Sequence, residues 1–140
     1  MNFIFSPDFS KENGIGQLIR CLNLASELKN KGAKITFIVN KNNILNFPIK
    51  IKKKFKLIHY RGSADSRSKY NLELIFNKIK KIKDNINSIL VIDNYKIDTN
   101  WERKIKKYVK KVFVIDDFLK PHHCDFYLNQ GNILEKKSFN

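Results

Sequence analysis

Residues 13–28 read Asn-Gly-Ile-Gly-Gln-Leu-Ile-Arg-Cys-Leu-Asn-Leu-Ala-Ser-Glu-Leu, a glycine-rich turn that runs directly into a periodic apolar segment. The apolar side chains recur at three- and four-residue steps, at Ile15, Leu18, Ile19, Leu22, Ala25 and Leu28. This spacing predicts an amphipathic α-helix whose apolar face packs on another element. Upstream, the apolar run inside residues 2–6 predicts a short buried strand. The first unit of the chain is therefore strand, glycine turn, helix.

The glycine turn lies where open parallel sheets bind ligands, at the carboxyl end of a strand. We expect Gly14 and Gly16 to take positive φ and to let the backbone approach a ligand, while the first amides of the helix point towards it. The turn matches neither nucleotide motif, because Ile19 occupies the third glycine position of the dinucleotide fingerprint and no Gly-Lys-Ser/Thr follows. A turn that only caps a helix stays open as an interpretation.

The rest of the chain repeats this alternation of β-branched runs and amphipathic segments. Strands are predicted at 35–39, 55–60, 88–93, 112–115 and 126–128. One helix is predicted from Tyr70 to Ile82. Another is predicted after a cap at Asp98 or Thr99, with four apolar side chains on one face, at Trp101, Ile105, Tyr108 and Val109. A short helix before Pro48 is possible within residues 41–54. The pattern indicates an α/β fold with a Rossmann-like, mostly parallel sheet over residues 1–130, followed by a polar tail at 131–140.

Composition sets the broad class of the protein. With 140 residues and 42% hydrophobic content, the chain can bury the core of about one domain. It has no run of about 18 apolar residues and no signal-peptide pattern, so we expect a cytoplasmic protein without a membrane partner. Cys21 and Cys124 lack the spacing of a zinc site or a disulfide framework. We expect two free thiols and no bound metal.

The formal charge of +15 raises the question of nucleic-acid binding. Lysine supplies 24 of the 28 basic residues, and arginine, which is favoured for bidentate phosphate and base contacts, appears only four times. A solvated lysine surface is the simpler interpretation. Nucleic acid is therefore the least favoured partner.

Polar residues follow three of the predicted strands. They occupy the turn from Asp8 to Gln17, the segment Asp93–Tyr95 and the loop Asp116–Asp125. Because the carboxyl ends of parallel strands meet at one edge of a sheet, we expect these segments to converge there. Each aspartate alone could be an ordinary turn or cap residue.

Taken together, the motifs resemble a known family. The chain carries Asp8, Gly14, Gly16, Arg20-Cys21-Leu22, Leu24-Ala25, Asp93, Tyr95, Trp101-Glu102, Ile115-Asp116-Asp117, His122, Cys124-Asp125 and Leu128-Asn129-Gln130. In order and spacing, these residues resemble the N-terminal domain of the UDP-sugar hydrolases of pseudaminic acid biosynthesis and of the related spore-coat polysaccharide proteins.

The resemblance implies a fold, a reaction and a set of site residues. The fold would be the N-terminal half of a glycosyltransferase-B architecture, and the reaction a metal-independent, inverting hydrolysis of a UDP-linked amino sugar without a cofactor. The resemblance assigns catalytic roles to Gln17, Tyr95 and Asp8, and substrate-binding roles to Gly14, Gly16, Arg20, Asp93, Asp117, His122 and Asn129.

The chain also departs from that family. Gln17 stands where the family has its catalytic histidine, Ser6 where it has arginine, and Gly131 where it usually has asparagine. Glutamine can orient water but cannot take up a proton near neutral pH. No UDP-binding domain follows Asn129 in this sequence. We therefore expect a half that is inactive alone and needs a separate C-terminal-domain chain or self-association; the alternative is a non-catalytic remnant or a sugar-binding module.

Overall fold

Six strands form one sheet in a computed structural model of the chain, which describes residues 1–10, 14–46, 52–63 and 68–130. The strands are β1 (Asn2–Pro7), β2 (Lys34–Asn40), β3 (Lys56–Tyr60), β4 (Ser88–Asp93), β5 (Lys111–Ile115) and β6 (Phe126–Leu128). The helices are α1 (Gly16–Asn30), α3 (Lys69–Lys81) and α4 (Thr99–Ile105), with 3₁₀ turns η1 (Lys41–Asn46) and η2 (Asn85–Asn87). Every pair of neighbouring strands is parallel, which confirms the predicted Rossmann-like α/β fold.

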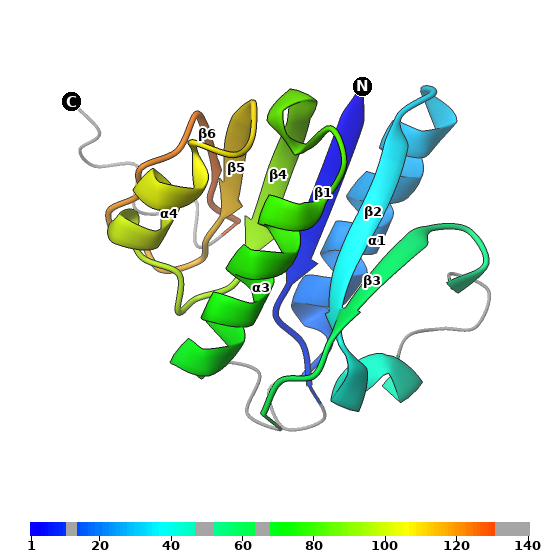
Figure 1. Cartoon of the computed structure of the whole chain (residues 1–140), viewed down its shortest axis with the longest axis horizontal. Helices are drawn as coiled ribbons and strands as arrows, with labels where there is room; N and C mark the ends of the chain where they lie inside the picture. Colours follow the sequence, from blue (N-terminus) through cyan, green and yellow to red (C-terminus); the bar gives the residue numbers. More distant parts are fainter. Residues whose placement is uncertain (11–13, 47–51, 64–67, 131–140) are drawn as a thin grey trace.

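The sheet lies between two helical layers (Figure 1). Successive side chains of a strand point to opposite faces, and the core divides accordingly. Ile4 of β1 and Leu90 of β4 belong to the cluster under α3 and α4. Phe5 and Val91, one residue further along the same strands, belong to the cluster under α1. As predicted, β4 is central and is covered on both faces.

The strand order β3-β2-β1-β4-β5-β6 places a switch point between β1 and β4. The helix that follows β1 covers one face of the sheet, and the helix that follows β4 covers the other (Figure 1). The backbone amide of Asp8 donates to the carbonyl of Asp93 at 2.8 Å, which continues the pairing beyond the two strands. In open α/β sheets, the crevice outside the carboxyl ends at such a point is where ligands bind.

The buried face of α1 is rotated relative to the prediction. Leu18, Leu22 and Ala25 are buried as expected, and Cys21 joins them. Ile15 and Ile19, which were assigned to the same face, are 47% and 43% exposed. Neighbouring residues in a helix differ by about 100° in direction, so Ile19 points away from the sheet on which Leu18 packs.

Helix α4 is shorter than the sequence indicated. Asp98 caps it by accepting a hydrogen bond from the amide of Trp101 at 2.9 Å. The α-helix ends at Ile105, so the prediction that Tyr108 and Val109 continue it is wrong. The amide of Tyr108 donates to the carbonyl of Ile105, a three-residue step that tightens the chain into a turn.

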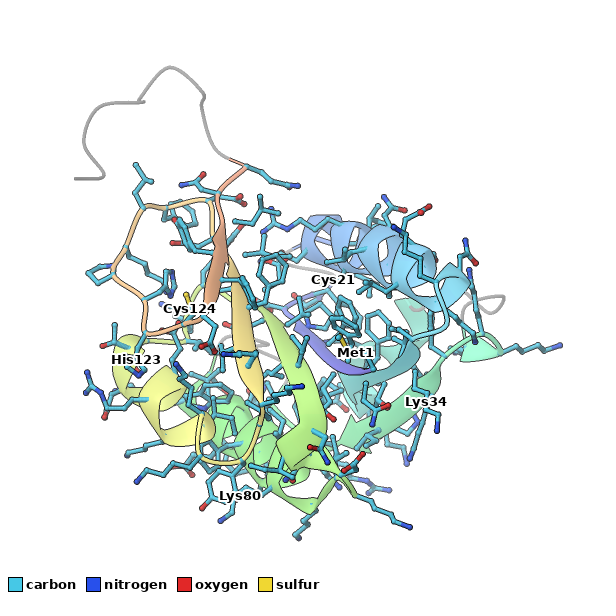
Figure 2. The ribbon with its side chains drawn as sticks, turned by 90° about the horizontal axis from the view of Figure 1, so that it is seen from above. Met1, Cys21, Lys34, Lys80, His123 and Cys124 are labelled. Carbon is cyan, nitrogen blue, oxygen red and sulfur yellow. The ribbon has the colours of Figure 1, made fainter. Side chains whose placement is uncertain are left out.

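Three further predictions concern the connections and the cysteines. The short helix expected before Pro48 is the 3₁₀ turn η1, and the predicted tail 131–140 lies outside the described residues. Both cysteines are free thiols: Cys21 lies between α1 and the sheet, and Cys124 lies on the loop between β5 and β6 (Figure 2). Within the part of the chain that the structure describes, no helix has the length and apolar character needed to cross a membrane.

Candidate functional site

The glycine turn leads into α1 without a side-chain cap at Ile15. Gly14 takes φ of +87° and exchanges two backbone hydrogen bonds with Ser10, at 2.9 and 3.2 Å. Only glycine adopts this backbone region at no steric cost, so the predicted role of Gly14 in the turn is confirmed. Gly16 is the first residue of α1 and does not have positive φ, contrary to the prediction.

Arg20, one turn into α1, connects the ends of β4 and β5. Its guanidinium donates through Nε and Nη2 to the carboxylate of Asp93, the latter at 2.5 Å. Through Nη1 it also donates to both oxygens of Asp117, at 3.0 and 2.9 Å. Two carboxylates, 73 and 97 residues away in sequence, are thereby held by one planar donor group.

Tyr95 extends this network towards the surface. Its hydroxyl donates to Oδ2 of Asp117, and its ring packs edge-on against Phe118 with centroids 4.7 Å apart. Lys120 donates to the carbonyl oxygens of Tyr95 and Ile97, which fixes the segment that carries Tyr95. The β4 and β5 ends are therefore joined to each other as well as to α1.

These side chains surround a hollow of about 560 Å³ at the switch point. Its lining consists of Gly16, Gln17, Ile19, Arg20, Asn23, Tyr95, Asp117 and Gln130. Gln17 is 6% exposed, and its side-chain Nε2 has no hydrogen-bond partner among the described residues. A buried amide donor without a partner costs about 1–3 kcal/mol, so the wall of the hollow contains an unsatisfied donor. The volume is typical of small-molecule sites.

The electrostatics of the network follow from burial and from charge pairing. The hydrogen bond to Asp93 is the main cause that raises the pKa of the Arg20 guanidinium, which stays charged. Burial raises the pKa of Asp93, and the hydrogen bonds from Arg20 oppose that shift. Burial, followed by the hydrogen bond to Asp117, raises the pKa of Tyr95 to about 12. Near neutral pH, the Tyr95 hydroxyl is therefore a donor and not a base.

Of the residues assigned to the site from sequence, Gly16, Gln17, Arg20, Tyr95 and Asp117 line the hollow, and Asp93 lies buried behind Arg20. Asp8 and Gly14 do not line it; Asp8 is buried at the end of β1, near enough to Tyr60 to help raise its pKa, although burial is the larger cause. Asn129 donates to the hydroxyl of Tyr127 at 3.3 Å, and its neighbour Gln130 is the residue that reaches the hollow.

His122 lies away from the hollow, between two buried carboxylates. Its Nδ1 is 2.5 Å from Oε1 of Glu102 in α4, and its Nε2 is 2.9 Å from Oδ2 of Asp116. Its side chain is 5% exposed. Burial opposes ionisation of Asp116, but the hydrogen bonds from His122 and from the amides of Phe118 and Lys120 outweigh it and lower the pKa of that carboxyl. The structure thus places His122 in a link between α4 and the loop after β5.

The sequence interpretation did not assign several of these residues. Ile19 comes immediately before Arg20 in α1, and Asn23 comes three residues after Arg20. A three-residue step in a helix places Asn23 on the same face as Arg20. Gln130 follows the end of β6, so the rule that found the other strand ends applies to it as well. Glu102 is fully buried although two basic residues, Arg103 and Lys104, follow it, and no sequence signal identifies its partner.

The comparison with curated proteins finds a distant relative. The chain is 28% identical over 135 residues to UDP-2,4-diacetamido-2,4,6-trideoxy-beta-L-altropyranose hydrolase of Campylobacter jejuni subsp. jejuni serotype O:2. The alignment covers 92% of this chain and 41% of that enzyme, so the chain spans about two fifths of the length of its relative. This similarity supports a relationship to a UDP-sugar hydrolase. No family model matches the chain, and no solved structure matches it.

Proposed function

We propose that this domain binds the sugar of a UDP-linked amino sugar, as one half of a hydrolase similar to the Campylobacter jejuni enzyme. The observation that carries the proposal is the hollow at the switch point, whose lining includes Gln17, a residue with a buried amide Nε2 that has no partner in the described part of the chain. Arg20, Tyr95 and Asp117 supply the other polar groups of the lining. Hydroxyl and amide groups of a sugar can pair with such donors and acceptors.

Hydrolysis also requires a group that accepts a proton from the attacking water. Gln17 cannot accept it, and Tyr95 is protonated. Asp117 is the carboxylate of the lining, with a side chain 28% exposed. We assign the orientation of the water or sugar to Gln17 and the acceptance of the proton to Asp117.

Binding without hydrolysis is the second candidate, and a specific observation favours it. Both oxygens of Asp117 already accept hydrogen bonds from Arg20, and one of them also accepts from Tyr95. A carboxylate held in this way has fewer free lone pairs for an additional water. In that case, the domain is a sugar-binding module.

The UDP moiety would be bound outside this domain. The sequence resemblance assigns UDP to a second domain, and the relative is more than twice as long as the region aligned here. We propose that this second part is supplied in the same polypeptide, by a separate chain or by self-association.

The first experiment measures binding. Amide chemical shifts of the chain would be followed while the UDP-linked diacetamido sugar, the free sugar and UDP are added separately. We expect the two sugar ligands to shift Gly16, Gln17 and Tyr95, and UDP alone to leave them unchanged. Shifts confined to residues outside the hollow would refute the proposed site.

The second experiment separates hydrolysis from binding. The chain would be joined to the remaining part of the Campylobacter jejuni enzyme, and UDP release would be compared between the unchanged sequence, Gln17→His, Asp117→Asn and Glu27→Gln. General acid–base groups contribute about 10²–10⁴-fold, so we expect Gln17→His to raise the rate within that range and Asp117→Asn to lower it. Glu27→Gln removes an exposed carboxylate of α1 and is the matched control. Sugar binding with no UDP release from any variant would favour the sugar-binding module.

A further inference from the structure

A second hollow lies on the opposite face of the sheet, between α3 and α4. Its volume is about 480 Å³, and its floor includes Phe76 of α3 and Trp101 of α4. Both helices lie side by side on that face (Figure 1). The segment between β4 and α4 separates the two hollows, because Tyr95 lines the first and Lys96 lines the second.

The indole of Trp101 is fixed in this hollow by two contacts. Its Nε1 donates to the carbonyl of Leu72 at 3.2 Å, which ties α4 to α3. Its ring meets that of Phe76 edge-on, with centroids 5.6 Å apart and planes at 85°. The side chain is only half-buried. Trp101 is therefore an ordered aromatic surface that a flat ligand ring can cover without a conformational change.

Three lysines surround this aromatic floor. Lys69, Lys96 and Lys104 line the hollow and are exposed, and in the described part of the chain none of their ammonium groups has a carboxylate within 4.0 Å. The lining also contains two carboxylates, Glu73 and Asp98, but Asp98 accepts the capping hydrogen bond of α4. The hollow thus combines an aromatic platform with unpaired positive charge.

We propose that the hollow between α3 and α4 binds a nucleoside phosphate, with the base on Trp101 and the phosphate among Lys69, Lys96 and Lys104. Stacking on an aromatic side chain favours the binding of a base and tolerates any base. Lysines provide the charge that a phosphate requires. Part of the lysine-rich composition that argued for a solvated surface thereby lines a hollow together with an aromatic ring. This site is separate from the sugar hollow and does not depend on the proposed hydrolase function.

The test uses the single tryptophan of the chain as its reporter. Trp101 fluorescence, excited at the red edge of indole absorption, would be followed during titration with UMP, uridine, inorganic phosphate and a short oligouridylate. We expect UMP to quench the emission in a saturable way, uridine to bind more weakly, and phosphate alone to leave the spectrum unchanged. Tighter, steeply salt-dependent quenching by the oligouridylate would identify a single strand as the source of the nucleotide; equal affinity would identify a free nucleotide.

Charge variants test the lysines directly. We expect Lys69→Gln combined with Lys104→Gln to weaken UMP binding about fivefold, since two exposed ion pairs together contribute on the order of 1 kcal/mol. Lys34→Gln removes the same charge from the amino end of β2, whereas Lys96 of the hollow follows the carboxyl end of β4. This variant should leave binding unchanged. Asn23→Ala changes an exposed residue in the lining of the hollow at the switch point and should also leave the quenching unchanged, which separates the two sites. An absence of saturable quenching, an equal response to phosphate, or equal affinity of the double variant and Lys34→Gln would overturn the proposal.

Discussion

At the scale of single residues, Arg20 determines the geometry of the hollow at the switch point. Its fork of N–H donors contacts the carboxylates of Asp93 and Asp117 together, and the Asp93 carboxylate is completely buried. Removal of the guanidinium would leave that carboxylate without its charged partner in a low-dielectric environment. The residue is therefore expected to stabilise the fold as well as to shape the site.

We expect Arg20→Leu to lower the free energy of unfolding by about 3–5 kcal/mol, the typical cost of breaking a buried ion pair on one side. Urea denaturation measures the change. Arg103→Leu, in an exposed position of α4, is the matched control and should change stability by no more than about 0.5 kcal/mol. Equal effects of the two substitutions would contradict the importance of the Asp93 and Asp117 contacts.

The carboxylates beyond β5 predict how stability depends on pH. At Asp116 and at Asp125, burial opposes ionisation but hydrogen bonds outweigh it and lower the pKa below the ordinary value of 3.8. A lowered pKa in the folded state contributes stability that is complete above the unfolded value and is lost as the pH falls through the folded value. We therefore expect the free energy of unfolding to fall as the pH is reduced below about 4.

Asp93 acts in the opposite direction, because its raised pKa makes protonation favourable to folding as the pH falls towards 3.8. Asp116→Asn isolates the contribution of Asp116. The slope of stability against pH below about 4 should be shallower in this variant than in the unchanged protein. An identical slope in thermal denaturation at several pH values would show that Asp116 does not contribute.

The sequence predicted the residues near the strand ends better than it predicted the path of the loop between β5 and β6. Gln17, Arg20, Tyr95 and Asp117 each adjoin the carboxyl end of a strand, so topology alone brings them together. His122 belongs to a loop that the sequence assigned to the same edge. In the structure, Oδ2 of Asp125 accepts from the amide of Val112 at 2.8 Å, so the loop has returned to the amino end of β5 by that residue. On this path His122 contacts Glu102, and contacts between residues distant in sequence have no local signature.

At the scale of elements, α1 packs through the apolar stripe that the sequence predicted, with its boundaries displaced. Leu22 is 4% exposed in the cluster between α1 and the sheet. Leu22→Asp would bury a carboxylate there, and we expect it to cost several kcal/mol of the roughly 5–15 typical of a domain. Asn23→Asp adds the same group to the next, exposed residue and should leave the melting temperature almost unchanged. Equal melting temperatures of the two variants would show that this face of α1 is not buried.

Helix ends were harder to predict than helix faces. The apolar spacing of Trp101, Ile105, Tyr108 and Val109 is compatible with a helix throughout, yet α4 ends at Ile105. Val109 is buried and joins the same core cluster from the turn. Periodicity reports which side chains are buried, and a turn that buries the same side chains gives the same pattern.

At the scale of the whole molecule, the sheet has a protected centre and one sparsely covered edge. β1 and β4 pair over six residues in the middle of the sheet, whereas β6 is three residues long and all three are exposed. Local opening is easiest where few apolar contacts must be broken. We expect the amides of β4 to exchange with deuterium most slowly and those of β6 most quickly.

Hydrogen exchange followed by mass spectrometry measures both strands in one sample. Comparison at two protein concentrations is the control for self-association. Protection of 126–128 that equals that of β4, and that disappears on dilution, would mean that a second copy covers the edge. Protection of β6 at every concentration would contradict the expected gradient across the sheet.

The wide separation of Arg20 from its partners also has a consequence for synthesis on the ribosome. Asp117 follows Arg20 by 97 residues in the sequence. At about 5–20 residues per second, roughly 5–20 s pass between the translation of the two residues. During that interval, the nascent chain can form α1 but cannot yet assemble the network that holds Asp117. The hollow at the switch point is therefore completed only after β5 has been translated, and a nascent chain arrested before β5 would carry Arg20 without one of its two carboxylates.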